Sequence, residues 1–415
     1  MRWIKPSRIH GRVAAPPSKS AMIRAVAAAS LAGGITEIRN PAFCDDALAA
    51  LGVSVALGAK VACNERAVKI KGQGRPVKSI LDCGESGLSL RLFAPVAALG
   101  EKEMTLSAQG SLKARPVGMI EVPLAELGAV CRSQAGYPPL MVKGPLRGGC
   151  AHLDGSVSSQ FLTGLLTALP VCENDSELTV ARLTSRPYVD LTISVLERFG
   201  VSVSWNRTKD VFQVRGRQRF EPQRYDVEGD WSAAAFLLVA GAIAGRITVG
   251  NLAPDSCQAD RRILDVLRAA GAVIATGDSE VSVEAGELRA FDFDATDSPD
   301  LFPPLAALAC FCDGLSSLRG VYRLRHKESD RAAALVEEFS RIGGQLEIRG
   351  NVMRIQGRRL EGGAVDSRDD HRLAMAGSVA GLRCGNGVRV EGAQSVSKSY
   401  PRFFEDLASV GGDIA

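Results

Sequence analysis

The sequence has few of the residues that mark nucleic-acid-binding, zinc-binding and disulfide-bonded proteins. Aromatic side chains make up only 5% of its 415 residues, which argues against platforms on which bases could stack. It has four histidines and ten scattered cysteines without a CxxC pair, so neither a zinc site nor a disulfide framework is indicated. We therefore expect a protein that binds no metal and keeps its cysteines as free thiols.

Long apolar runs and clusters of one charge are also missing. The longest apolar run, Ala233–Gly245, is too short to cross a bilayer. Residues 21–33 resemble the apolar part of a signal sequence, but Arg24 interrupts them, so we expect a cytoplasmic protein without a targeting segment. The net charge is +4, with the two signs interspersed. This balance suits small anionic ligands better than nucleic acid, which usually binds a clustered basic face.

Repetition is what the sequence offers instead. An amphipathic helical pattern closed by a glycine recurs at separations of 68 to 76 residues, and the glycines predicted to cap these helices are Gly52, Gly128, Gly200, Gly271, Gly343 and Gly411. Between them recurs a small-residue helix that is apolar on every side, hence buried, and that follows a polar stretch. The markers of these polar helix starts are 67 to 73 residues apart: Ser20, Gly87, Ser159, Ser232, Asp300 and Arg372.

Each repeat has the order strand, buried helix, strand, exposed helix and two strands, which is a βαβαββ unit. Six copies predict an α/β protein of two domains, because one compact core rarely serves a chain of this length. We assign residues 15–227 to a domain of units one to three, and residues 1–14 with 228–415 to a domain of units four to six. Three buried helices would form each interior, with sheets and exposed helices outside, as in an inside-out α/β barrel.

One charged stretch, residues 325–331, precedes a helix-forming run. Lys327 and Arg331 are four residues apart and share a face if both lie on the first turns of that helix. Two neighbouring cations repel unless an anion lies between them, and a helix N-terminus offers free N–H groups to such an anion. Alone, this stretch would be interpreted as a solvated turn. Its recurrence at other polar helix starts favours an anion-binding site.

These helix starts resemble the enolpyruvyl transferase family. The resemblance covers about Ser7 to Leu407 and rests on separated motifs, which are residues 17–20 with Arg24, 155–161, 185–188, 227–230, 299–300, 327–331, 370–375 and 397–401. The family's fold is a pair of three-unit domains, in agreement with the repeat count. The implied reaction, in the shikimate pathway, transfers the enolpyruvyl group of phosphoenolpyruvate to the 5-hydroxyl of shikimate 3-phosphate and releases phosphate. It proceeds by addition and elimination through a tetrahedral intermediate and requires no cofactor.

The resemblance also implies a role for each matching residue. Contacts with shikimate 3-phosphate are expected from Lys19, Ser20, Arg24, Ser158, Ser159, Gln160, Ser185, Tyr188, Asp300 and Lys327. Contacts with phosphoenolpyruvate are expected from Lys19, Gly87, Arg115, Gln160, Arg331, Arg372 and Lys398. Asp300 would be the base for the 5-hydroxyl, and Glu328 the proton donor to the methylene carbon, with Lys19 a rival for that role. Asp45, Asp46 and His371 also match and would support these groups.

Each assignment has a plainer structural alternative. Lys19 could be a solvated lysine, Ser158 and Ser159 ordinary helix N-caps, and Asp300 an acid that only stabilises a helix start.

The sequence also departs from the family at a few positions. Glu85 and Leu88 stand where the family often has Asn and Thr, although Gly87 and Arg91 match. The polar contacts of that loop are therefore open, as is the role of Arg323, which stands where an asparagine is common.

Three other functions were weighed against this one. The enzyme that modifies UDP-N-acetylglucosamine usually has Lys-Asn where this chain has Lys19-Ser20, and a loop cysteine where this chain has Gly110. RNA 3′-phosphate cyclases would need a nucleophilic histidine and an RNA surface. A non-catalytic anion-binding protein would gain nothing from Asp300 and Glu328. We expect a monomer with two small-molecule substrates and no nucleic-acid or membrane partner, whose domains close on shikimate 3-phosphate.

Overall fold

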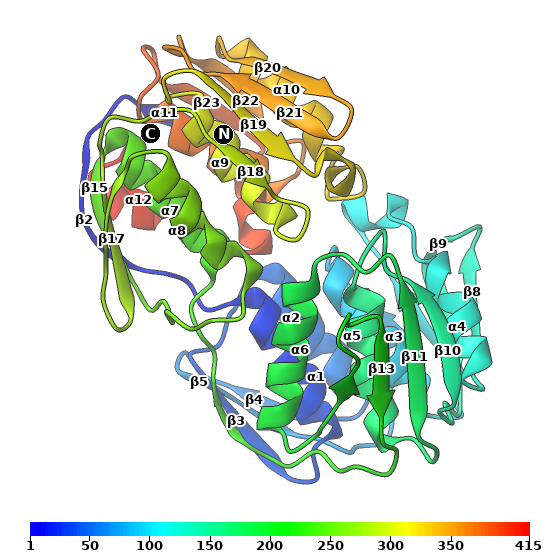
Figure 1. Cartoon of the computed structure of the whole chain (residues 1–415). Coiled ribbons are helices and arrows are strands. Elements are labelled where there is room, and N and C mark those ends of the chain that lie inside the picture. The colour runs from blue at the N-terminus through cyan, green and yellow to red at the C-terminus, as the bar shows by residue number, and fades with distance from the viewer. The chain divides into compact units, whose positions relative to one another are not determined.

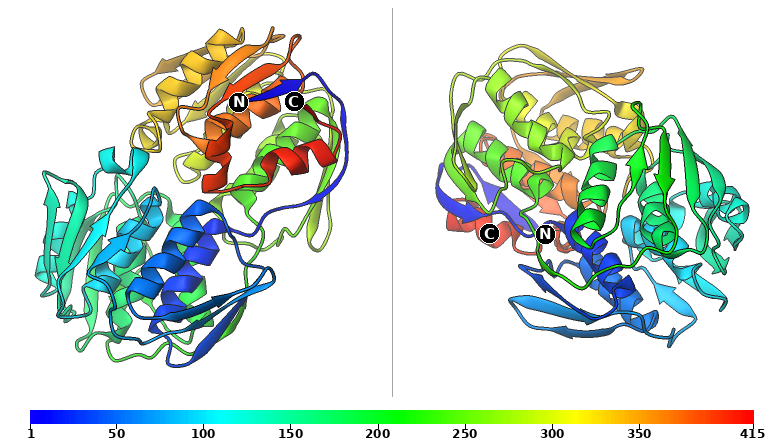
Figure 2. Two further views of the ribbon diagram at one scale, coloured as in Figure 1. Left: turned by 180° about the vertical axis from the view of Figure 1, so that it is seen from behind. Right: turned by 60° about the horizontal axis from the view of Figure 1, so that its bottom comes forward.

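The computed structural model describes residues 1–415 and divides them into two compact units. The N-terminal unit is Pro17–Val227, and the C-terminal unit joins Met1–Pro16 to Glu228–Ala415 (Figure 1). Each unit has a hydrophobic core of its own. The two ends of the chain both lie in the C-terminal unit, close together in both views of Figure 2, where Trp3 donates a backbone hydrogen bond to Ala415.

Each unit contains three four-stranded sheets of one topology, in which the first two strands are parallel and the other pairs antiparallel. In the N-terminal unit the sheets are β14-β3-β5-β4, β6-β7-β9-β8 and β10-β11-β13-β12. Their strands are β3 (Ile35–Arg39), β4 (Lys60–Cys63), β5 (Ala67–Lys71), β6 (Ile80–Asp82), β7 (Met104–Ser107), β8 (Val130–Gln134), β9 (Tyr137–Lys143), β10 (Cys150–Asp154), β11 (Ser176–Ala181), β12 (Ser204–Trp205), β13 (Val211–Val214) and β14 (Arg224–Asp226).

The C-terminal unit repeats this arrangement with the sheets β2-β15-β17-β16, β18-β19-β21-β20 and β22-β23-β1-β24. Their strands are β1 (Arg2–Lys5), β2 (Ile9–Ala14), β15 (Gly245–Gly250), β16 (Val273–Thr276), β17 (Glu280–Glu284), β18 (Asp292–Asp294), β19 (Leu315–Arg319), β20 (Gln345–Arg349), β21 (Val352–Gln356), β22 (Gly363–Asp366), β23 (Val388–Glu391) and β24 (Asp413–Ile414). The six sheets confirm the predicted six-fold repetition and the α/β class.

The first strands of two repeats are exchanged. β2 precedes the first buried helix in the chain, yet it pairs with β15 of the C-terminal unit. β14 precedes the fourth buried helix, yet it pairs with β3 of the N-terminal unit. The chain therefore passes between the units twice, after β2 and after β14.

The helices fall into two classes, as predicted. The inner helices are α1 (Lys19–Leu31), α3 (Gly87–Ala97) and α5 (Gln160–Ala168) in one unit and α7 (Trp231–Ala244), α9 (Phe302–Ala309) and α11 (His371–Gly381) in the other. The outer helices are α2 (Asp45–Ala56), α4 (Glu121–Glu126), α6 (Arg186–Arg198), α8 (Ile263–Ala269), α10 (Arg331–Arg341) and α12 (Phe403–Ser409). In α7 nearly every residue is buried, because neighbouring helices and sheets surround a helix that is apolar on every side. None of these helices is both long and apolar enough to span a membrane.

Five of the six predicted capping glycines follow outer helices with positive φ, from 79° at Gly200 to 102° at Gly411. The prediction for Gly52 is wrong, since this residue lies inside α2, which continues to Ala56. The cap is Gly58, with φ 104°. Burial of Val53 and Ala56 against the core outweighs the β-branched composition that suggested a strand there.

Candidate active site

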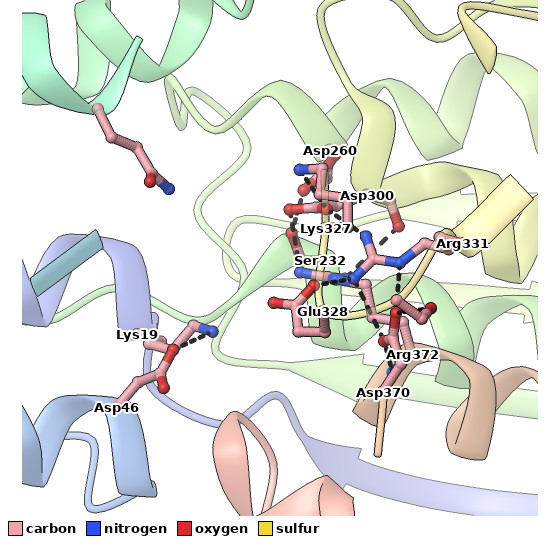
Figure 3. A network of polar contacts seen from close by, with 12 residues as sticks. Lys19, Asp46, Ser232, Asp260, Asp300, Lys327, Glu328, Arg331, Asp370 and Arg372 are labelled. Atoms are coloured by element: carbon pink, nitrogen blue, oxygen red, sulfur yellow. Dashed lines mark hydrogen bonds and ion pairs between the residues drawn. The ribbon is translucent and has the colours of Figure 1, made fainter. Parts of the chain in front are cut away.

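In the C-terminal unit, charged side chains gather where α9, α10 and α11 begin (Figure 3). Helix α10 starts at Arg331, because the Asp330 side chain accepts the N–H of Ala333 and caps it there. Lys327 and Glu328 therefore lie in the preceding non-helical turn, and the predicted shared helical face is wrong. Lys327 and Arg331 still converge, and the anion between them is a carboxylate of the protein itself, that of Asp300.

Arg331 is the centre of this cluster and is completely buried. Its Nε lies 2.8 Å from Asp370 Oδ2 and its Nη1 lies 2.9 Å from Asp300 Oδ1, while Nη2 pairs with Glu328. Burial lowers the pKa of Arg331, but the carboxylates of Asp370, Glu328 and Asp300 raise it more, so its net pKa is above the ordinary value. Its charge is therefore fixed, and it orders three acids.

Asp300 lies in a short 3₁₀ turn (Pro299–Leu301) ahead of α9. Its Oδ1 is 3.2 Å from Lys327 Nζ and its Oδ2 is 3.2 Å from Arg372 Nη2. Burial raises the pKa of Asp300, but Arg372, Lys327 and Arg331 together hold it well below its usual range. The carboxylate contacts these cations and no backbone N–H, so the structure does not place it as a helix cap.

Lys327 has the opposite balance. Burial lowers its pKa to about 8, although the carboxylate of Asp300 acts in the other direction. Lys327 therefore changes charge close to neutral pH, whereas Arg331 does not.

Asp370 is an acid of this site to which the sequence reasoning gave no role. It is fully buried, caps α11 by accepting the N–H of Arg372 at 2.9 Å, and accepts the Ser329 hydroxyl at 3.1 Å as well as Arg331. The side chain of Lys398 is also buried, and its Nζ lies 2.7 Å from the carbonyl oxygen and 2.8 Å from the carboxylate of Asp369. The signal in the sequence that could have indicated Asp370 is an acid directly before a small-residue apolar run that starts His-Arg.

In the N-terminal unit, Lys19 is the first residue of α1, after the Ser18 cap. Its Nζ lies 2.8 Å from Asp46 Oδ2, with both side chains little exposed (Figure 3). The structure thus does not support the alternative of a solvated lysine, and Asp46 lies where a supporting group was expected. Ser89 of α3 lies close by, with its hydroxyl 3.4 Å from the Asp46 carbonyl oxygen.

Arg24 lies one turn further along α1 and is buried. It donates from Nε to Thr192 Oγ1 at 2.9 Å, from Nη1 to the Ser20 carbonyl at 2.8 Å, and from Nη2 to the Tyr188 carbonyl at 3.1 Å. Burial lowers its pKa to about 10, since the neighbouring tyrosines compensate only partly. Ser185, at the start of α6, has a left-handed backbone with φ 55° and is buried, whereas Tyr188 is half-buried.

Two arginines, Arg91 and Arg115, contact residues at the starts of α5 and α3. Arg91 Nη1 donates to Gln160 Oε1 at 2.8 Å, which joins α3 to the first residue of α5. The guanidinium of Arg115 lies against Gly87, where an added Cβ would be 2.7 Å from Nη1. The Ser158 hydroxyl accepts the Gln160 N–H at 3.2 Å, while Ser159, the N-cap residue of α5, is buried and makes no side-chain capping bond.

The altered loop has a structural explanation. The Glu85 carboxylate accepts the N–H of Ser111 at 2.9 Å and its hydroxyl at 3.0 Å, so it holds the 3₁₀ turn Gly110–Ala114 that precedes Arg115. Gly110 has φ 46°, and a Cβ there would lie 2.3 Å from Glu85 Cδ. A cysteine could not take the place of Gly110 while Glu85 keeps this position.

Each unit thus brings its own predicted residues to the starts of its helices. The N-terminal unit places Lys19, Ser20, Arg24, Gly87, Arg115, Ser158, Ser159, Gln160, Ser185 and Tyr188 there. The C-terminal unit places Asp300, Lys327, Glu328, Arg331, Arg372 and Lys398 there. His371 is the buried first residue of α11. Both sets suit binding of multiply charged anions, and the second set adds acids among its cations.

The two-unit fold, with charged side chains gathered at the starts of its helices, is that of an enolpyruvyl transferase. A family model for EPSP synthase (3-phosphoshikimate 1-carboxyvinyltransferase) matches residues 4–407, and the chain belongs to that family. A 3-phosphoshikimate 1-carboxyvinyltransferase of Aeropyrum pernix is 40% identical, with 99% of this chain and 96% of the relative covered. One of Methanopyrus kandleri is 41% identical over 97% of this chain and 96% of the relative.

Solved structures agree with this assignment. An EPSP synthase from Acinetobacter baumannii superposes with a TM-score of 0.84 at 25% identity, covering 100% of this chain and 99% of that one. The enolpyruvyl transferase NikO from Streptomyces tendae, at 18% identity and a TM-score of 0.78 over 100% of this chain and 98% of that one, shares the fold.

Proposed function

We propose that this protein transfers the enolpyruvyl group of phosphoenolpyruvate to the 5-hydroxyl of shikimate 3-phosphate and releases phosphate. The observation that carries the proposal is the pair of acids, Asp300 and Glu328, held among Lys327, Arg331 and Arg372. Cations alone would serve binding of two phosphates and two carboxylates. Acids in the same cluster weaken anion binding, and a reaction in which protons must move gives them a use.

The contacts of Asp300 suggest how it becomes a base. In the free protein three cations stabilise its carboxylate, which makes it a weak base. Anionic groups of the substrates would engage Arg372, Lys327 and Arg331 and partly neutralise them. The pKa of Asp300 would then rise toward the range in which it can accept the proton of the 5-hydroxyl. Basicity would appear only when the substrates are bound.

Two groups compete for protonation of the methylene carbon. Glu328 lies beside the buried Arg331, and Lys19 carries its charge beside Asp46. Phosphoenolpyruvate would be held by Lys19, Gly87, Arg115, Gln160, Arg331, Arg372 and Lys398. Arginines suit this work because their planar fork binds carboxylate and phosphate oxygens in pairs.

We further propose that the protein is a cytoplasmic monomer. Its substrates are shikimate 3-phosphate and phosphoenolpyruvate, and it has no cofactor and no nucleic-acid or membrane partner. Its family membership and the interspersed positive and negative residues of its sequence support this proposal.

The experiment that tests the proposed function identifies the modified acceptor. The protein is incubated with phosphoenolpyruvate and an equimolar mixture of shikimate 3-phosphate and UDP-N-acetylglucosamine, and the products are examined by mass spectrometry. We expect the carboxyvinyl group on shikimate 3-phosphate alone. Because the Gly110–Arg115 loop has no cysteine, an epoxide that alkylates such a cysteine should leave activity unchanged. Modification of the UDP-sugar, or rapid inactivation by the epoxide, would contradict the proposal.

A further inference from the structure

A buried carboxylate outside the substrate-binding set connects two of its helices. Glu338 is fully buried and lies on α10, seven residues after Arg331, so it is on the same face of the helix two turns away. Its Oε1 accepts Arg368 Nε at 3.0 Å and Arg368 Nη2 at 2.7 Å. Its Oε2 accepts the backbone N–H of Asp366 at 3.0 Å and Arg341 Nη1 at 3.0 Å. All four contacts are with donors.

The segment held by Glu338 is the turn from β22 to α11, residues 366–370. Arg368 and Asp369 have φ values of 50° and 58°, which are unfavourable for residues with a side chain and persist only where contacts hold them. Around them, the Arg368 N–H donates to Asp366 at 2.8 Å and the Ser367 hydroxyl donates to the Gly392 carbonyl at 3.1 Å. This strained turn ends at the acid that caps α11.

Three site residues depend on where this turn lies. Asp370 binds Arg331 and caps α11, whose second residue is Arg372. Asp369 binds Lys398. Glu338 therefore joins the helix that carries Arg331 to the turn that orients Arg331, Arg372 and Lys398, without itself contacting any of them.

We propose that Glu338 is a positioning residue of the phosphoenolpyruvate clamp and acts through Arg368 and the 366–370 turn. The inference rests on the proposed function, which assigns Arg331, Arg372 and Lys398 to phosphoenolpyruvate. The carboxylate is specific for this task, because each of its oxygens meets two donors.

The test compares the same substitution at neighbouring residues. In Glu338→Gln the amide NH₂ group must face two donors whichever way it is turned, so the turn loses contacts on one side. Glu337→Gln is the matched control, since Glu337 also pairs with Arg368 but is mostly exposed. Arg368→Lys is a milder second variant, which keeps the charge and removes the two-donor fork.

For Glu338→Gln we expect KM for phosphoenolpyruvate to rise about tenfold, less than the hundredfold that a displacement of about 1 Å can cost. KM for shikimate 3-phosphate should rise by a clearly smaller factor, because most of the residues assigned to it, Lys19 and Arg24 among them, lie in the other unit. Arg368→Lys should raise KM for phosphoenolpyruvate by a smaller factor. Glu337→Gln should have the same KM values as the unmodified protein.

Melting temperatures and active-site titration give the fraction of folded, active protein in each sample, so that every rate can be expressed per folded molecule. A lower melting temperature with unchanged constants per folded molecule, or equal rises in both KM values, would overturn the inference. If Glu338→Gln does not fold, Arg368→Lys decides by the same criterion. Absence of turnover in the unmodified protein would instead reject the proposed function.

Discussion

Two buried arginines, Arg24 in the inner helix α1 and Arg331 at the start of the outer helix α10, have opposite electrostatic environments. Arg24 donates to a hydroxyl and two carbonyl oxygens, and burial lowers its pKa to about 10. Arg331 is surrounded by three carboxylates, which raise its pKa above the ordinary value. The guanidinium of Arg24 is held by neutral oxygens, whereas the guanidinium of Arg331 is held by carboxylates.

The difference shows that the partners of a buried arginine, and not its burial alone, decide the direction of its pKa shift. Helix starts with uncompensated cations bind anions, because free N–H groups and guanidinium groups both favour negative charge. Helix starts with cations and carboxylates together bind anions less strongly but keep acids ionised and ordered. Lys19 of the N-terminal unit also pairs with a carboxylate, that of Asp46, so the contrast concerns Arg24 and Arg331 and not the two units as wholes.

Removal of Asp300 is expected to have the largest effect. Asp300→Ala should still bind shikimate 3-phosphate but lose about 10²- to 10⁴-fold in kcat, the usual range for a general acid or base. Asp292→Ala, which removes an exposed carboxylate of β18, is the control. The measurements are steady-state kinetics, calorimetric binding and melting temperature. A fall in melting temperature with intact kcat would instead mean that Asp300 is a structural residue at a helix start.

A carboxylate placed beside Arg24 should remove the difference between the two arginines. In Thr192→Asp the new charge would compensate Arg24, and shikimate 3-phosphate binding should weaken about tenfold, as expected for loss of one charge-assisted contact. Thr192→Asn has nearly the same size without the charge and serves as the control. Equal dissociation constants for the two variants, measured by calorimetry, would show that Arg24 is not an anion-binding group.

The low pKa of Lys327 predicts a smaller, pH-dependent effect. Its ammonium group is charged below its pKa of about 8 and becomes neutral as pH rises through that value. An anion-binding cation is then lost, so kcat/KM for shikimate 3-phosphate should fall severalfold above about pH 8, because kcat/KM reports the free enzyme. Lys327→Arg should abolish that decline between pH 7 and about pH 9. If both proteins keep the same pH profile, Lys327 does not bind the substrate.

The smallest expected effect is a decrease in the radius of gyration of the protein when shikimate 3-phosphate binds. Both units carry cations, and like charges oppose compaction until an anion binds. We expect shikimate 3-phosphate to reduce the radius of gyration by a few per cent and to tighten binding of a phosphoenolpyruvate analogue, with equal reciprocal coupling. Small-angle scattering and calorimetry test this prediction. An unchanged radius together with independent binding of the two ligands would contradict it.

The repeat and its helix starts could be predicted because they depend on local composition and spacing. The predicted helix cap at Gly52 was wrong. Helix α2 continues to Ala56 because it packs on a core formed by residues far away in the sequence. The hydrogen-bond partners of the site residues could not be predicted either, because they also lie far away in the sequence. Thr192 meets Arg24 across 168 positions, and Asp370 meets Arg331 across 39. Glu338 was missed because a glutamate in an amphipathic helix normally belongs to its solvated face.

The most direct test asks whether the protein, with Asp300 and Glu328 among its cations, turns its substrates over or only binds them. The unmodified protein is titrated with shikimate 3-phosphate by calorimetry, and phosphate release from phosphoenolpyruvate is followed by a coupled assay with and without that acceptor. The account predicts saturable binding, and phosphate release only when both substrates are present. Saturable binding without phosphate release would contradict it and would leave a non-catalytic anion-binding protein on the same fold.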